Sequence, residues 1–441
     1  MSLKPAKPQI TILSSSKDGT TGHIQALATH TASYDALVLD ARLRQSLVTV
    51  RSLGRRGLRV AALGTSTGLP AFSSRWCQQS FYAPPYEHDP EPFLSYLIEV
   101  LNQNKVGVLI TSSDDVVALI RQHRERFESR VSLALAKEPA LGIVISKAQT
   151  LEIAQHLGIG IPREVKLGTV SEVEAALHEI GLPAVIKPIE SWVWDARQQQ
   201  GKRLVSKLVT TSDEARRAVE ELTGCGVSVL FQQFLSGRRE AVNLLYAQGR
   251  VYARFAQWAK RTHPPLGGVS VYRQSIAIPP DIGDQSERLV REIALEGYAE
   301  VEFRRDDAGK PYLMEINPRL SASIEVAVRA GVDFPYLLYQ WARGEPISVV
   351  EGYREGVWMR FLGGDIMLTI ESLKQRGRPG IPHPARTIFD FWSAFLTPTG
   401  WDYLAWRDPL PALTATKTFT GRWVGAAIHK RLARLRRRKN P

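Results

Sequence analysis

The sequence predicts a protein of mixed α/β and α+β class that begins with a doubly wound domain. A short apolar run at residues 36–40, a helical stretch and a second apolar run at 58–64 form a βαβ unit of about 30 residues, which is typical of a parallel sheet. Farther along, residues 228–235, 240–260 and 269–279 have the patterning of antiparallel strands. We therefore expect two kinds of sheet in one chain.

Local signals mark the elements between these strands. Helices are predicted where apolar residues recur at helical spacing, and strands where short apolar runs end in turn residues. Gly158 and Pro162 terminate the helix predicted at 147–162. The helix predicted at 211–222 begins with a Thr/Ser cap. The other predicted elements are helices at 93–105 and 284–297, strands at 106–112 and 184–190, and a hairpin at 301–318 that turns at 307–309.

Composition excludes several classes of protein. The chain has 441 residues, of which 44% are hydrophobic and 23% charged, so it is not disordered, collagenous or a disulfide scaffold. Its two cysteines, Cys77 and Cys225, provide neither a disulfide framework nor a Cys-based zinc site. No apolar run approaches about 18 residues, and the first residues lack the apolar core of a signal peptide. We therefore expect a cytoplasmic protein.

The net charge of +13 is unevenly distributed. Residues 409–441 contain nine basic residues and no acidic one, which leaves only +4 for residues 1–408. A nearly balanced body argues against nucleic-acid binding. Ile428, Leu432 and Leu435 are spaced for one face of a helix, so residues 422–441 are predicted to form a basic amphipathic tail. The tail suits an anionic membrane surface or an acidic partner, and a solvated helix is the alternative.

These patterns divide the chain into five parts. The predicted parts are a flexible leader at 1–34, an N-terminal α/β domain at 35–140, a larger domain at 141–345, a C-terminal extension at 346–421 and the tail at 422–441. The N-terminal domain is not expected to bind a dinucleotide. The turn after residues 36–40 begins at Ala41 and contains no glycine, which a pyrophosphate would need for close approach to the backbone.

The hairpin at 301–319 carries the strongest chemical signal. Residues i and i+2 of a strand face the same side, so Glu315 and Asn317 project together, and the turn places Glu302 opposite them. Three oxygen ligands on one face suit a hard cation such as Mg²⁺. Arg319 points the same way and could clamp phosphate oxygens. A surface hairpin with solvated charges is the alternative, although the apolar neighbours of Glu315 would make its burial costly without a partner.

Other segments carry weaker signals. Lys187 closes an apolar strand before a proline, where a strand can deliver an ammonium group into a cleft and hold phosphate. Lys147 opens a helix 40 residues earlier. Residues 232–240 form an extended segment whose backbone could pair with an adenine edge, followed by an acid for ribose hydroxyls. Arg261 and Arg273 flank a Gly-Gly loop and could bind a substrate carboxylate or stay solvated.

Taken together, these segments resemble the ATP-grasp superfamily. The matching pieces stand in family order: SKAQTLEIAQHLGIGIP, LPAVIKP, LFQQFLSGRREAVNLL and VEFRRDDAGKPYLMEINPRLSASIEVAVRAGVDFP. With residues 35–64, which resemble the domain that precedes ATP-grasp in carboxylate–amine ligases and carbamoyl-phosphate-synthase-like proteins, the resemblance covers about 35–345. It implies an ATP-grasp fold with two subdomains around a nucleotide cleft at 141–345, after a pre-ATP-grasp domain.

The resemblance also implies site residues, carried over by position. Lys147 and Lys187 would bind the nucleotide phosphates, and Arg319 would neutralise the transferred phosphoryl group. The adenine hinge would be Gln233, Phe234 and Leu235, the ribose ligand Glu240, and the ligands of Mg²⁺ (or Mn²⁺) Glu302, Glu315 and Asn317.

One segment departs from the family pattern. The family has a glycine-rich loop over the phosphates after the Lys-Pro strand, whereas residues 190–203 contain one glycine and two tryptophans. Either Arg197, Lys202 or Arg203 covers the phosphates, or the lid works differently. Trp192 and Trp194 either close over a substrate or pack against the small domain.

The implied activity is that of an ADP-forming ligase. Such an enzyme activates a substrate carboxylate as an acyl-phosphate with ATP and joins it to an amine, and both substrates would be small molecules. Two alternatives stay open: activation of bicarbonate or carbamate, as in carbamoyl-phosphate synthetases, and a non-catalytic nucleotide-binding protein with a basic tail. The resemblance to this superfamily also leads us to expect a homodimer.

Overall fold

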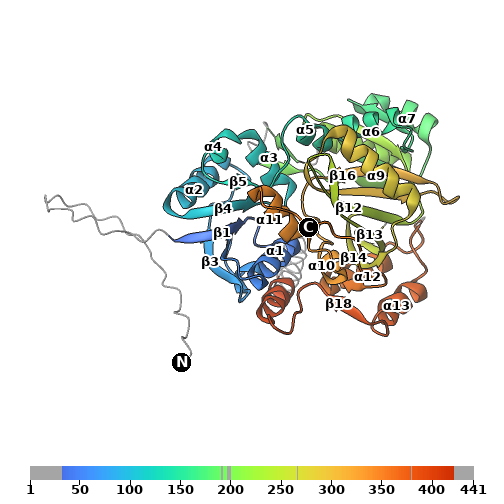
Figure 1. The fold of residues 1–441 in the computed structure, drawn as a ribbon. Coiled ribbons are helices and arrows are strands. Elements are labelled where there is room, and N and C mark those ends of the chain that lie inside the picture. Colours follow the sequence, from blue (N-terminus) through green and yellow to red (C-terminus); the bar gives the residue numbers. More distant parts are fainter. Residues whose placement is uncertain (1–31, 190–191, 196–199, 266, 379, 422–441) are drawn as a thin grey trace, which may run out of the picture.

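The computed structural model describes residues 32–189, 192–195, 200–265, 267–378 and 380–421. The predicted leader at 1–34 therefore lies almost wholly outside the described residues, and the predicted tail at 422–441 lies outside them entirely. Three larger sheets, one two-stranded sheet and the helices that cover them make up the described part of the chain (Figure 1). Over the described ranges, no helix has both the length and the apolar composition needed to cross a membrane.

The first sheet is parallel and five-stranded, in the order β3-β2-β1-β4-β5. Its strands are β1 (Ser33–Val38), β2 (Val60–Gly64), β3 (Cys77–Tyr82), β4 (Lys105–Ile110) and β5 (Ser132–Leu133). Its helices are α1 (Arg44–Arg55), α2 (Pro90–Gln103), α3 (Asp114–Gln122) and α4 (Glu125–Glu128). Side chains fix two helix starts: Asp89 accepts a hydrogen bond from the Glu91 amide, and Ser113 accepts one from the Val116 amide. The doubly wound fold predicted from the βαβ pattern is confirmed.

The second sheet is antiparallel, four-stranded and has a hydrophobic core of its own. Its order is β10-β7-β11-β6, with β6 (Glu164–Leu167), β7 (Ala184–Pro188), β10 (Lys207–Val209) and β11 (Val229–Gln233). The helices α7 (Val173–Ile180) and α8 (Ser212–Thr223) cover it, and α5 (Ala140–Ile145) and α6 (Lys147–His156) lead into it. Thr211 caps α8, as the Thr/Ser signal predicted.

The third sheet has seven strands in the order β16-β15-β12-β13-β14-β17-β18. The strands are β12 (Arg239–Ala247), β13 (Arg250–His263), β14 (Val269–Ile276), β15 (Gly297–Arg305), β16 (Pro311–Asn317), β17 (Trp358–Arg360) and β18 (Thr399–Trp401). The accompanying helices are α9 (Pro280–Ile293), α10 (Glu325–Ala330), α11 (Phe334–Arg343), α12 (Leu362–Lys374) and α13 (Pro384–Ser393). Because β17 and β18 come from residues 346–421, the predicted extension contributes two strands to this sheet.

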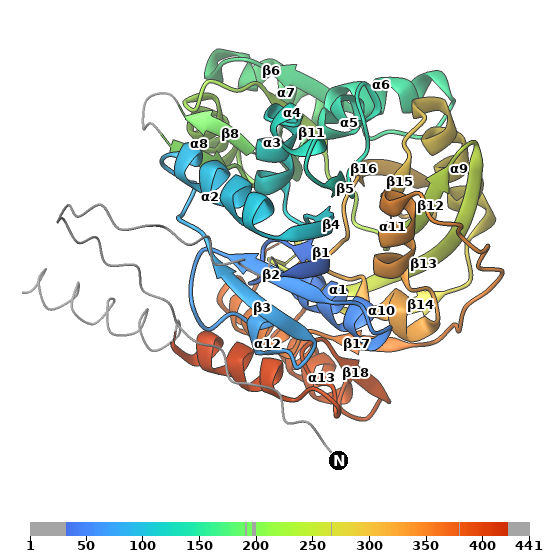
Figure 2. The same cartoon turned by 60° about the vertical axis from the view of Figure 1, so that its left-hand side comes forward.

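The N-terminal domain and the seven-stranded sheet share their packing. One buried cluster includes Leu94 and Leu119 of the first domain together with Leu289 and Leu313 of the second. In Figure 2 the parallel sheet lies beside the large sheet, and the red C-terminal segments run beneath both. The N-terminal domain and the seven-stranded sheet therefore pack directly against each other, and the four-stranded sheet lies above them in this view.

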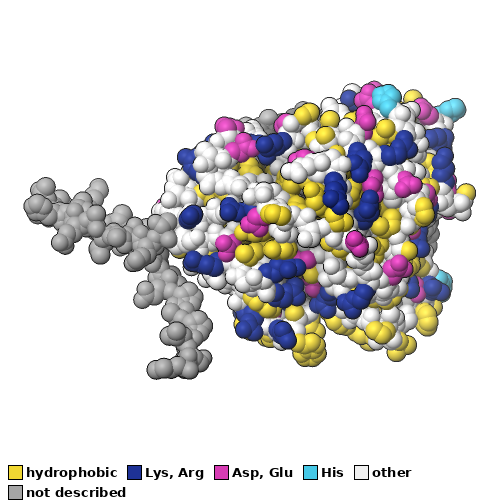
Figure 3. All heavy atoms as spheres, viewed as in Figure 1, with side chains coloured by type: hydrophobic (Ala, Val, Ile, Leu, Met, Phe, Trp, Pro, Cys, Tyr) yellow, Lys and Arg dark blue, Asp and Glu magenta, His cyan; other side chains and the backbone are white. Residues whose placement is uncertain are grey.

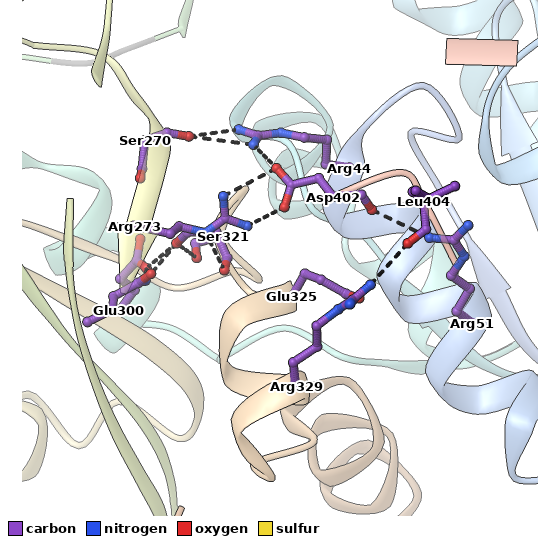
Figure 4. Close-up of polar contacts among 12 residues, drawn as sticks. Arg44, Arg51, Ser270, Arg273, Glu300, Ser321, Glu325, Arg329, Asp402 and Leu404 are labelled. Carbon is purple, nitrogen blue, oxygen red and sulfur yellow. Dashed lines mark hydrogen bonds and ion pairs between the residues drawn. The ribbon is translucent and has the colours of Figure 1, made fainter. Parts of the chain in front are cut away.

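Buried ion pairs add to this contact (Figure 4). Asp402 accepts hydrogen bonds from Arg44 of α1 and Arg273 of β14, and Asp408 accepts one from Arg51 of α1 at 2.9 Å. Since charges this deeply buried need partners, the C-terminal segment ties α1 to the large sheet.

Candidate active site

A cavity of about 1850 Å³ lies where the three sheets meet. Among the predicted site residues, those that line it are Lys147, Lys187, Glu240, Glu302, Glu315, Asn317 and Arg319. They come from α6, β7, β12 and the β15–β16 hairpin, so the fold gathers residues from four places in the chain. Gln233, Phe234 and Leu235 are not among the lining residues.

The β15–β16 hairpin sets the two acids opposite each other. Its register pairs Glu302 with Glu315 and Glu300 with Asn317, and a bulge after Glu302 inserts Met314. The predicted cross-strand placement is therefore confirmed. Glu302 is only 7% exposed, so a solvated surface hairpin, the alternative, is wrong.

The two acids differ in their electrostatics. Burial raises the pKa of Glu302 to about 8, although Arg239 opposes the shift by donating from Nε at 3.0 Å. Burial also disfavours ionisation of Glu315, but Lys147 and Lys187 outweigh it and lower its pKa. Full ionisation of such a buried pair is costly without more positive charge nearby.

The lysines face these acids. Lys187 lies near the end of β7 and is 9% exposed. Burial lowers its pKa to about 8, while Glu315 opposes the shift and Lys147 adds to it. Lys147 is the first residue of α6, whose N-terminus is capped by Ser146. The cavity thus brings two ammonium groups and a carboxylate pair together, as expected of a site that holds phosphate and a cation.

Arg319 connects the hairpin to the N-terminal domain. Its Nε donates to Asp114, the first residue of α3, and its Nη2 lies 3.5 Å from the Asn317 oxygen. Burial opposes the positive charge, but Asp114 raises the pKa of Arg319. Asp114 directly follows a predicted strand. The residues around it give no sign that it pairs with Arg319, which lies 205 residues away in the chain.

The predicted hinge segment is held by other contacts. The Gln233 side chain lies 3.4 Å from the Arg163 amide, which donates to it, and Leu235 is buried. The Phe234 ring lies 5.6 Å from the Arg304 guanidinium. The side chains therefore point to protein neighbours, and a role in adenine binding would fall to the backbone.

Glu240 lines the cavity, but two arginines already contact it. Arg305 donates to its carboxylate at 2.7 Å, and Arg238 lies 3.0 Å from the other oxygen. The turn before β12 explains the placement of this segment: a Cβ on Gly237 would lie 2.3 Å from the Arg305 carbonyl oxygen, so only glycine fits against the hairpin.

Sequence reasoning missed two features of the site. Arg239 binds Glu302 and also donates to the Gly268 carbonyl, which joins the hairpin to the 263–269 loop. Glu300 is buried and accepts hydrogen bonds from Asn243 and Gln257, both at 3.1 Å. The paired arginines before Glu240 were visible in the sequence, but a strand pattern alone does not indicate which carboxylate they meet.

Arg261 and Arg273 have neither of their expected roles. Arg261 forms a two-point ion pair with Asp365, and Arg273 forms one with Asp402. Both arginines therefore serve the packing of the C-terminal segment rather than a substrate or the solvent.

The remaining expectations concern the lid and the metal. Residues 192–195 and 200–203 pair as the antiparallel strands β8 (Trp192–Asp195) and β9 (Gln200–Arg203). Arg197 lies outside the described residues, so the choice among the candidate lid residues stays a prediction. Within the described part of the chain, no group of three or more His, Cys, Asp or Glu side chains is arranged to hold a metal; the predicted set has two carboxylates and one amide.

Comparison with known proteins agrees with this architecture. Residues 227–361 match the family described as ATP-grasp in the biosynthetic pathway with Ter operon. D-alanine–D-alanine ligase of Pseudomonas entomophila is 24% identical over 217 residues, which cover 45% of this chain and 64% of that one. The chain thus spans less than two thirds of the length of this relative.

Solved structures show the same fold. The biotin carboxylase of Campylobacter jejuni, in complex with β,γ-ATP, superposes with a TM-score of 0.58 and 14% identity, over 74% of each chain. The L-amino acid ligase of Bacillus licheniformis superposes with a TM-score of 0.57 and 18% identity, over 75% of this chain and 80% of that one. The chain therefore has the ATP-grasp fold predicted from its motifs. In sequence it is similar to carboxylate–amine ligases of the ATP-grasp superfamily.

Proposed function

We propose that this protein is an ATP- and Mg²⁺-dependent ligase that joins a small-molecule carboxylate to an amine and releases ADP and phosphate. The observation that carries the proposal is the convergence of Lys147, Lys187, Glu302 and Glu315 in one cavity. The similarity to a D-alanine–D-alanine ligase and to an L-amino acid ligase supports this class of reaction.

The donor set fits a magnesium ion. Glu302 and Glu315 face each other across the hairpin, and burial raises the pKa of Glu302 to about 8. A divalent cation beside this pair would offset the cost of ionising both groups, and carboxylate and amide oxygens are its preferred ligands. Glu302, Glu315 and Asn317 would hold the ion, which when bound supplies positive charge to the phosphate oxygens.

The chain's own residues would bind and orient the substrates. Lys147 and Lys187 would hold the phosphates of ATP, and Glu240 with the backbone of residues 233–235 would hold the nucleoside. Arg319, positioned by Asp114, would neutralise the phosphoryl group during transfer. In such transfers the protein contributes position and charge, so no nucleophilic side chain is required.

The proposed reaction has two steps. An oxygen of the substrate carboxylate attacks the γ-phosphorus of ATP, and the bond to the bridging oxygen of ADP breaks. The amine nitrogen then attacks the carbonyl carbon of the acyl-phosphate, phosphate leaves and the nitrogen loses a proton. Closure of the cavity from water would protect the acyl-phosphate from hydrolysis.

The test is ADP release with Mg-ATP against pooled carboxylates and amines, with Glu315→Gln as the blank. Release that needs one carboxylate and one amine supports the ligase and names its substrates. Release with bicarbonate alone would favour the carbamoyl-phosphate-synthase-like alternative. Stabilisation by Mg-ATP without turnover for any pool would favour a nucleotide-binding role.

Two further expectations belong to this proposal. We place the protein in the cytoplasm because the reaction consumes ATP, and fractionation of cells tests this placement. We also propose a homodimer, which light scattering of the purified chain tests.

A further inference from the structure

The Glu300 carboxylate lies in the cavity but has no role in the reaction proposed above. Glu300 belongs to β15 and lies two residues before Glu302, so the two side chains face the same side of the strand. It lines the cavity, is 3% exposed and stands opposite Asn317 in the register of the hairpin. A further carboxylate is therefore placed directly beside the proposed metal ligands.

Only one oxygen of this carboxylate is occupied. Its Oε2 accepts hydrogen bonds from Asn243 Nδ2 and Gln257 Nε2, both at 3.1 Å, and from Ser323 Oγ at 3.3 Å. Over the described ranges of the chain, no donor forms a hydrogen bond to its Oε1. This second oxygen is therefore left to a group that enters the cavity.

The charge of Glu300 has no partner of opposite charge. Its three donors are neutral amide and hydroxyl groups, and within the described residues it forms no ion pair. Arg239 of the same cavity pairs instead with Glu302. Arg319 pairs with Asp114. Because a buried carboxylate is costly unless its charge is compensated, this position favours a cationic group.

Two more arginines close to this network are committed elsewhere. Arg273, which donates to the Ser323 carbonyl oxygen at 3.2 Å, points its guanidinium toward Asp402 (Figure 4). Arg44 lines the cavity and also donates to Asp402. Their positive charge is thus shared with Asp402, and neither arginine pairs with Glu300.

Acids on the surface of the protein are in a different situation. On the face that Figure 3 shows, acidic side chains are interspersed with lysines and arginines. Water and dissolved salt compensate such charges, so they need no specific partner. Glu300, at 3% exposure, has little of this compensation.

A second acceptor lies on a neighbour of Glu300. Gln257 comes from β13, lines the cavity and is 5% exposed. Its Nε2 donates to Glu300 and, at 2.6 Å, to Ser323, whereas its Oε1 has no hydrogen-bond partner among the described residues. A primary ammonium group carries three donor hydrogens, so it can bond to more than one of these oxygens.

From these observations we propose that Glu300 binds a protonated amino group of a substrate through its Oε1, with Gln257 as a second acceptor. The inference rests on the proposed function, because it assigns this group to a substrate of the ligase. Aliphatic amines are protonated near neutral pH, and their charge-assisted hydrogen bond to a carboxylate is stronger than one from a hydroxyl. The amino group belongs either to an amino acid or to an amine without a carboxylate, and the experiment separates the two.

The first experiment measures binding to the full chain by calorimetry in the presence of Mg-ADP. Two pairs of probes differ in ammonium against hydroxyl: L-alanine with L-lactate, and propylamine with 1-propanol. We expect the ammonium member of at least one pair to bind at least about tenfold more tightly than its hydroxyl counterpart. Preference confined to the alanine pair assigns the site to an amino acid, and preference in the propylamine pair assigns it to an amine that needs no carboxylate. No preference in either pair would overturn the proposal.

Variants test the role of Glu300 itself. Glu300→Gln keeps an oxygen that accepts from Asn243 and Gln257 but loses the charge, so the preference for ammonium should fall at least about tenfold. Glu300→Asp keeps the charge and should bind the preferred probe more tightly than Glu300→Gln. Glu221→Gln is the matched control, because Glu221 lines the same cavity but pairs with Lys207. Thermal unfolding of each variant verifies the fold, and the paired probes on the wild type decide the question if Glu300→Gln does not fold.

Two results with the variants would also overturn the proposal. The first is an unchanged preference for ammonium in Glu300→Gln; if stabilisation by Mg²⁺ disappears instead, Glu300 is a metal ligand. The second is an equal loss of preference in Glu221→Gln, which would indicate a general effect of charge in the cavity. None of these readouts requires turnover, so a failure to release ADP would reject the ligase without deciding the ammonium site.

Discussion

Asp402 is a buried carboxylate whose removal should strongly damage the assembly of the fold. Its oxygens lie 2.5 Å from Arg44 Nη1 and 2.5 Å from Arg273 Nη2, and the three side chains are 2%, 8% and 0% exposed respectively (Figure 4). Asp402→Asn keeps the shape but removes the charge, so two buried guanidinium groups lose their shared counter-charge.

Removal of one partner from a buried pair costs about 3–5 kcal/mol. For a cooperative unit of the size of these domains, that loss lowers the melting temperature by roughly 10 °C. The matched control is Asp390→Asn, because Asp390 pairs with Arg386, whose side chain is 65% exposed. Such an exposed pair contributes about 0–1 kcal/mol.

The assay is urea-induced and thermal unfolding followed by tryptophan fluorescence. The two arginines lower the pKa of Asp402 even though burial raises it. Because the folded-state pKa is depressed, the stabilisation is present above the unfolded-state pKa of about 3.9 and is lost as the pH falls through the folded-state value. The gap between wild type and Asp402→Asn should therefore persist at neutral pH and close in strong acid. A neutral-pH change no larger than that of Asp390→Asn would refute the reasoning.

Three further predictions concern the cavity. Glu315→Gln should lower ATP turnover by about 100-fold or more while the protein still unfolds in a cooperative transition, since a charge at the reacting phosphate is lost; normal turnover would reject the metal-site assignment. The KM for ATP should rise as the pH is raised through about 8, where Lys187 loses its proton, and Lys187→Arg should flatten this profile; an unchanged wild-type profile would contradict the role. Finally, burial raises the pKa of Glu302 to about 8, so ionisation destabilises the metal-free fold as the pH rises toward that value. The stabilisation by added Mg²⁺, measured as a melting-temperature shift that EDTA reverses, should grow over the same range and vanish in Glu302→Gln; a shift that persists in Glu302→Gln would point to another site.

The sequence accounts for much of the fold because its strongest signals are local. The βαβ spacing after residue 35 and the strand-and-turn pattern of 301–318 both lie within short stretches, where the period of the apolar residues reflects one buried face. The turn at 307–309 sets the register next to it, which pairs Phe303 with Leu313, and the bulge at Met314 then brings Glu302 opposite Glu315.

Signals for residues 346–421 were weaker. The strands β17 and β18 are three residues each, too short for an alternating pattern to emerge. The strand β17 joins the large sheet by pairing with β14, which is a long-range contact, and β18 pairs with β17. From the sequence, Arg273 could be predicted only to bind a substrate or to be solvated. Its actual partner, Asp402, lies 129 residues away in the chain.

The sequence by itself therefore predicted three of the five strands of the first sheet, the hairpin acids and the place of Lys187 at the end of an apolar strand, since each depends on neighbours in the chain. Only the tertiary structure decided which charges meet: Arg239 with Glu302, Arg319 with Asp114, and Asp402 between two arginines from different sheets. A buried charge is stable only beside an opposite charge or a hydrogen-bond donor or acceptor, and packing, not spacing along the chain, supplies that partner.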